Sequence, residues 1–95
     1  MTAPIGIHEL ELTLIREKQA WQDWKLRDAD LELELMGRIA KKTAWPKDYK
    51  PLVEAFHTAL SHAREVIRNR DTTRISAAHS KLERSIFAFR DRLYV

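Results

Sequence analysis

The sequence contains no cysteine, and it has only two glycines and three prolines among its 95 residues. The absence of cysteine excludes a disulfide scaffold and a zinc site built on thiolates. No apolar run approaches the roughly 18 residues that a membrane-spanning helix needs, and the first six residues lack the basic and apolar regions of a signal peptide. We therefore expect a cytoplasmic protein without membrane contact, whose core is held together by non-covalent packing.

Charge of one sign is not in large excess either. Seventeen lysines and arginines face fourteen aspartates and glutamates, which leaves a net charge of only +3. The densest basic cluster, here called the basic rim, consists of four arginines: Arg64, Arg68, Arg70 and Arg74. Such a cluster suits phosphates or an acidic protein surface. Because Glu65 and Asp71 lie within the same stretch, the sequence favours an ion-paired face over a nucleic-acid footprint.

Scarce glycine and proline leave room for long helices, and the fold class predicted is all-α, with a single domain over residues 1–95. The predicted elements are a helix over about 7–42, a linker over 43–48, a helix over about 49–69 and a helix over about 72–93. The last two are joined by a short polar link, so we expect them to form an antiparallel hairpin. At 1.5 Å per residue the first helix spans roughly 54 Å, and each of the others roughly 30 Å.

The long first helix would carry two apolar faces. The first face follows alternating spacings of three and four in which Glu17 and Asp28 are the polar positions, and its seven apolar residues are Ile7, Leu10, Leu14, Trp21, Trp24, Leu31 and Leu35. The second lies about 140° round the helix and contains Leu12, Ile15, Leu26, Ala29, Leu33, Met36 and Ala40. One hairpin can cover only one face, so two copies are expected to form an intertwined or side-by-side homodimer. The alternative is a monomer whose first helix breaks near residues 27–30, where Asp28 interrupts the first face, and folds back as a four-helix bundle.

The predicted core seams of the last two helices are apolar arcs that include Phe56 and Leu60 on the first and Leu82 and Ile86 on the second. Large apolar side chains outside these seams are the candidate anchors for the dimer or for a protein partner. They are Leu14, Trp21, Trp24, Leu31, Leu35, Phe87 and Tyr94. The basic rim would orient an acidic surface around them. This combination predicts a non-enzymatic regulator or adaptor of bacterial or phage type, such as an anti-activator that occupies the docking surface of a transcription factor. The alternative is a nucleic-acid-binding regulator that uses the basic rim.

Residues typical of catalysis or metal binding do not assemble along the sequence. His57 and His62 are five residues apart, whereas two zinc ligands on one helix face need a spacing of three or four. Glu54 and His57 match one half of a di-iron motif, but the second half is missing from the chain. We therefore predict no catalytic residue, metal or cofactor. His79 falls near the centre of an apolar face, either as a hydrogen-bonded core residue or as a pH-sensitive one.

The predicted outline, a long helix followed by two shorter ones in an intertwined dimer, resembles the all-helical chorismate mutases. The resemblance implies that arginines and a lysine on the first helix bind a dicarboxylate substrate, together with an arginine-containing acidic motif at the start of the second helix. The first helix offers Arg16, Arg27, Arg38 and Lys41. The segment 46–54, however, contains no arginine. A chorismate-mutase-like enzyme is therefore the lower alternative, and the chain is not placed in that family.

Overall fold

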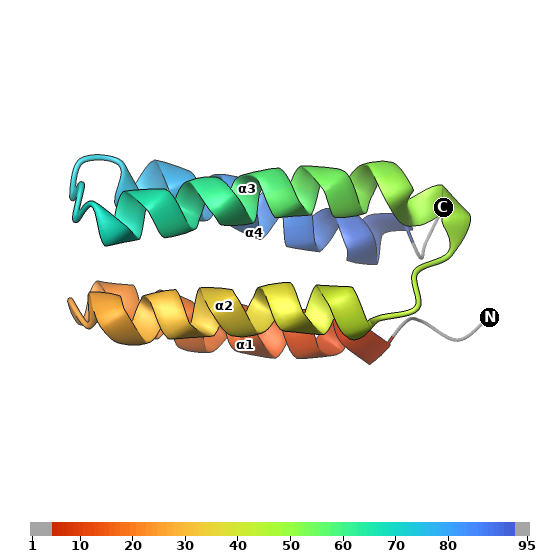
Figure 1. Cartoon of the computed structure of the whole chain (residues 1–95), viewed down its shortest axis with the longest axis horizontal. Helices are drawn as coiled ribbons and strands as arrows, with labels where there is room; N and C mark the ends of the chain where they lie inside the picture. The colour runs from red at the N-terminus through yellow and green to blue at the C-terminus, as the bar shows by residue number, and fades with distance from the viewer. Residues whose placement is uncertain (1–4, 93–95) are drawn as a thin grey trace.

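The computed structural model describes residues 5–92, and within them it forms four α-helices and one short 3-10 helix. The elements are α1 (Ile5–Gln22), α2 (Leu26–Lys42), η1 (Lys47–Tyr49), α3 (Lys50–Arg68) and α4 (Ile75–Arg92). The helices form two antiparallel hairpins, α1–α2 and α3–α4, which stack along the same long axis (Figure 1). The fold is all-helical, as predicted. None of the described helices is long and apolar enough to cross a membrane.

The predicted continuous helix over 7–42 is wrong, because the chain turns back at residues 23–25 and forms α1 and α2. Trp24 adopts a left-handed backbone conformation with φ 61°. Its N–H donates to the Trp21 carbonyl at 3.1 Å, and the Lys25 N–H donates to the Ala20 carbonyl at 2.8 Å. These are the two hydrogen bonds of a Schellman motif, which ends a helix. The fold-back into four helices that the alternative described is thus observed, but the break lies at residues 23–25 rather than near 27–30, and the long first helix that gave the outline of the chorismate mutases is not formed.

This turn also changes which apolar face points into the core. In α1 the buried large apolar residues come from the first face: Ile7, Leu10 and Leu14. In α2 they come from the second face: Ala29, Leu33, Met36 and Ala40. The hairpin therefore buries one half of each face. The large apolar residues of the unused halves, Leu12 and Ile15 on α1 and Leu31 and Leu35 on α2, remain exposed.

The second hairpin agrees with its sequence prediction to within a few residues at each helix end. Its buried residues are Phe56, Leu60, Ala63, Val66 and Ile67 on α3 and Ile75, Ala78, His79, Leu82, Ile86 and Phe89 on α4. The helix α3 ends in a second Schellman motif, in which Arg70 has φ 53°. Its N–H donates to the Ile67 carbonyl at 3.0 Å, and the Asp71 N–H donates to the Val66 carbonyl at 3.1 Å.

The two ends of the bundle are built differently (Figure 1). At one end the chain crosses from α2 to α3, and there Trp45 stacks on Phe89 with ring centroids 4.5 Å apart. A close backbone approach tightens the same end, since a Cβ on Gly6 would collide with the Thr43 side chain. Both hairpin turns lie at the opposite end, which we call the turn end. The core is thus closed by stacked rings at one end and by two helix caps at the other.

Candidate interaction surfaces

The structure divides the predicted anchors into core and surface residues. Leu14 is buried, and Trp21 is half-buried with its ring 5.5 Å from that of His79, so the chain's own core uses both. Tyr94 lies outside the described residues. The remaining four anchors are exposed: Trp24, Leu31, Leu35 and Phe87. Among the predicted anchors that the structure describes, these four offer apolar surface to another molecule.

Five exposed large apolar residues lie on the α1–α2 hairpin or on the neighbouring face of α4, and we call them the apolar band. Its members are 38–66% exposed: Leu12, Ile15, Leu31, Leu35 and Phe87. Ile15 and Phe87 line one shallow groove of about 310 Å³ between α1 and α4. An ion pair of 3.2 Å between Arg16 and Glu32 fixes the level at which α1 and α2 lie side by side.

The same ion pair shows where Leu12 and Leu35 lie relative to each other. Leu12 precedes Arg16 by one turn of α1, and Leu35 follows Glu32 by one turn of α2. Because the two helices are antiparallel, both leucines lie at the same level of the hairpin. The sequence analysis assigned Leu12 and Ile15 to the second face but did not select them as anchors.

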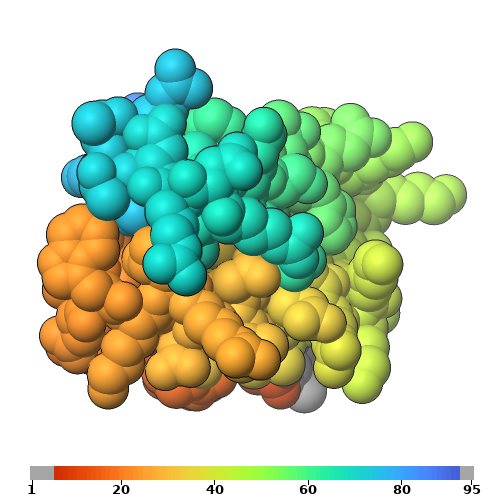
Figure 2. All heavy atoms as spheres, turned by 60° about the vertical axis from the view of Figure 1, so that its left-hand side comes forward, coloured from red at the N-terminus to blue at the C-terminus, as the bar shows by residue number. Residues whose placement is uncertain are grey.

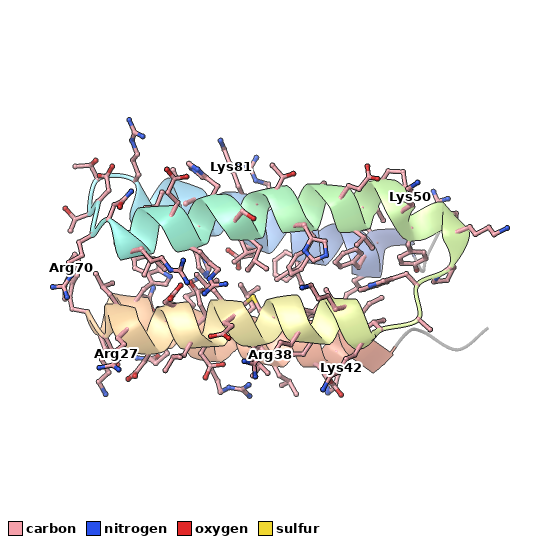
Figure 3. All side chains as sticks on the ribbon, in the orientation of Figure 1. Arg27, Arg38, Lys42, Lys50, Arg70 and Lys81 are labelled. Atoms are coloured by element: carbon pink, nitrogen blue, oxygen red, sulfur yellow. The ribbon has the colours of Figure 1, made fainter. Side chains whose placement is uncertain are left out.

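A pocket of about 580 Å³ opens at the turn end between the two hairpins. It is lined by residues of both turns, among them Trp24, Lys25, Arg27, Asp28, Arg70 and Thr72. The Trp24 side chain is 64% exposed. Arg70 extends from the α3–α4 turn toward the other hairpin (Figure 3), and the space-filling view shows the side chains of the two turns meeting at this end (Figure 2). Both residues with a left-handed backbone therefore lie on one pocket.

The four arginines of the basic rim do not act as one patch. Arg64 and Arg68 both donate to Asp30, at 3.1 and 3.3 Å, and Arg74 lies 3.4 Å from the Asp71 carboxylate. Only Arg70 has no acidic partner among the described residues. The aspartates neutralise the other three arginines. This leaves less positive charge for a nucleic acid, because phosphate binding depends on free cationic charge.

A carboxylate and an imidazole are buried together between α1 and α4. Glu17 Oε2 lies 2.7 Å from His79 Nε2, and the two side chains are 1% and 4% exposed. Glu83 lies 3.8 Å from the other ring nitrogen. Burial raises the pKa of Glu17, while the hydrogen bond and charge of His79 act in the opposite direction. The position of His79 in the core is as predicted, and its partner Glu17 is one of the two polar residues, with Asp28, that interrupt the first face.

The basic residues that the chorismate-mutase outline would require do not converge. Arg16 pairs with Glu32, Arg38 pairs with Glu34 on the surface of α2, and Arg27 lines the turn-end pocket. Within residues 5–92, no group of three histidine, aspartate or glutamate side chains could hold a metal ion. No family model, curated protein or solved structure matches the chain. The case for a function therefore depends on the two surfaces described above.

Proposed function

We propose that this chain is a small non-enzymatic interaction module that acts by stoichiometric binding of a protein partner through the apolar band. A regulator or adaptor, for example one that occupies the docking surface of a transcription factor, works in this way. The observation that carries the proposal is the exposure of five large apolar side chains on neighbouring helices. Contiguous exposed apolar surface of this kind marks sites of protein association.

The size of the band supports this function. Full burial of a leucine, isoleucine or phenylalanine side chain stabilises by about 1.5–3 kcal/mol. The five residues of the band are already partly covered, so a partner gains a fraction of that from each. In interfaces of this kind, a few fully desolvated residues near the centre supply most of the binding energy. Ile15, at 66% exposed, has the most surface left to bury.

In the absence of another partner, the proposed occupant of the band is a second copy of the chain. A two-fold axis lets the same patch serve both subunits, and the band spans α1 and α2, so two hairpins can pack face to face. The homodimer then uses the outer face of the first hairpin rather than an overhanging long helix. A heterologous protein partner competes for the same residues.

Light scattering over a concentration series tests the proposal. The expected mass is about twice the 11.2 kDa of the chain, and Ile15→Asp shifts it to that of the monomer because it places a carboxylate in the band. Ala55→Asp, at an exposed position of α3 on the other hairpin, is the matched control and keeps the dimer. Circular dichroism verifies that both variants are folded.

Partner binding is tested with the same pair of variants. Capture of a protein in one-to-one amounts, lost with Ile15→Asp and kept with Ala55→Asp, supports the module. A monomeric parent chain contradicts the homodimer. If, in addition, capture is indifferent to Ile15→Asp, the apolar band is not the binding surface.

A further inference from the structure

We propose that the turn-end pocket binds a short acidic segment of a partner protein. In this site Trp24 contacts an apolar side chain of the segment, and Lys25, Arg27 and Arg70 pair with its carboxylates. The pocket shares no residue with the apolar band. The site therefore goes beyond the function proposed above, and its test succeeds or fails independently.

The two turns share an unusual backbone conformation. Trp24 and Arg70 are the two non-glycine residues with positive φ among those described, and each occupies the position after a helix that glycine ordinarily fills. A side chain in this conformation is strained, whereas glycine is not. Both strained residues line the same pocket. Strained backbone retained around one concave site is characteristic of binding sites, because the side chain supplies something that glycine cannot.

The basic residues at the turn end differ in whether an aspartate of the chain engages them. Arg64, Arg68 and Arg74 are engaged by aspartates of the chain itself. The three basic residues that line the pocket have no acidic partner among residues 5–92: Lys25, Arg27 and Arg70. Asp28 is the one carboxylate on the lining. The pocket thus presents unpaired positive charge around an exposed indole, which complements an acidic ligand with an apolar centre.

The charges at the turn end favour a protein segment over a nucleic acid. Carboxylates stand among the cations, namely Asp23 in the α1–α2 turn, Asp28 in the first turn of α2 and Asp71 in the α3–α4 turn. A nucleic acid brings a continuous row of phosphates, which would meet these carboxylates as well as the cations. An acidic peptide can place separate carboxylates at the cations and an apolar residue on Trp24. The ligand class that fits is therefore a carboxylate-bearing peptide.

Fluorescence anisotropy with a defined probe tests this site. The probe is a labelled, end-blocked peptide in which aspartates and glutamates flank one leucine, and the comparison peptide carries asparagine and glutamine instead. The acidic peptide is expected to bind more tightly, and its affinity should fall as salt is added. In a nitrogen–proton spectrum, the indole signal of Trp24 should shift on binding, whereas that of Trp45, stacked at the other end, should not.

Arg70→Gly is the decisive variant, because glycine removes the guanidinium and relieves the strained backbone together. Affinity for the acidic peptide is expected to fall about tenfold or more, while the melting temperature stays equal or rises. Loss of binding therefore cannot be ascribed to unfolding. Lys50→Ala removes one positive charge at the opposite end of the bundle (Figure 3) and should leave the affinity unchanged.

Three outcomes overturn the proposal. In the first, the acidic and amide peptides bind equally, or neither binds. In the second, Lys50→Ala weakens binding as much as Arg70→Gly does. In the third, a single-stranded oligonucleotide binds more tightly than the acidic peptide and depends on Arg70, which would make the partner a nucleic acid.

Discussion

Trp24 and Trp45 each follow a helix closely, yet they lie at opposite ends of the bundle and in opposite environments. The Trp45 indole N–H donates to the Ala40 carbonyl at 2.9 Å, and its ring stacks on Phe89. Trp24 is 64% exposed. The same residue type therefore closes the core at one end and faces solvent at the other. The way the chain connects the helices at each end, rather than the residue type, therefore determines which tryptophan is available to a ligand.

The physical reason lies in how the chain passes each end. Residues 43–46 must cross from one hairpin to the other, so this segment lies over the end of the core and buries its aromatic side chain there. The two turns connect neighbouring antiparallel helices and satisfy their carbonyls with their own backbone N–H groups. No side chain is needed to complete them. The Trp45 side chain thus packs over the end of the core, whereas the Trp24 side chain is not needed to complete its turn.

Alanine substitution of each tryptophan is the most direct way to break this comparison. Trp45→Ala removes a packed ring and a hydrogen bond, and we expect it to lower the free energy of unfolding by about 3–4 kcal/mol. Trp24→Ala removes an exposed side chain and should change it by less than about 0.5 kcal/mol. Urea unfolding of both variants gives the two values. Equal costs would show that Trp24 also supports the core.

The next largest effect is expected at the buried pair of Glu17 and His79. His79→Leu leaves the Glu17 carboxylate buried without its partner, which costs about 3 kcal/mol near neutral pH. Burial raises the pKa of Glu17 above its ordinary value of 4.5, so the folded state holds this proton more tightly than the unfolded chain. The contribution of Glu17 to stability is thus fully present below 4.5, and it is lost as the pH rises through the raised pKa.

Urea unfolding as a function of pH measures this dependence. The cost of His79→Leu should shrink as acid protonates Glu17, whereas the cost of Trp45→Ala should stay constant. The double variant Glu17→Leu with His79→Leu is the control, and it should recover most of the lost stability because no charge remains buried. A cost of His79→Leu that is the same at neutral and acidic pH would mean that Glu17 is already protonated in the fold.

Sequence periodicity predicted the buried arcs of the second hairpin because each of those helices uses one apolar face from beginning to end. Phe56 and Leu60 on α3 and Leu82 and Ile86 on α4 are buried as expected. The apolar spacing of the first face continues across the observed turn through Trp21 and Trp24, and no glycine or proline marks residues 23–25. Asp28 therefore indicated a break a few residues too late, because a tryptophan occupies the left-handed position where glycine usually ends a helix.

The candidate sites were predictable to a smaller extent. Trp24 was selected as an anchor because it fell on an apolar face of a long helix, and it is exposed for a different reason, the turn. Lys25 and Arg27 were not selected, because the pocket that they line exists only where two turns distant in sequence meet. The ion pairing of Arg64 and Arg68 with Asp30 likewise depends on the packing of α2 against α3. Contacts between hairpins carry no periodic signal in the sequence.

The smallest expected effect sharpens the comparison at Trp24 itself. Trp24→Gly and Trp24→Ala remove the same ring, but only glycine relaxes the left-handed backbone. We expect the glycine variant to exceed the alanine variant by about 0.5–1 kcal/mol in the free energy of unfolding, even though glycine loses more conformational freedom on folding. Thermal and urea unfolding of the pair measure the difference. If the alanine variant is the more stable, the turn is not strained at this position, and retention of tryptophan there would no longer indicate selection for binding.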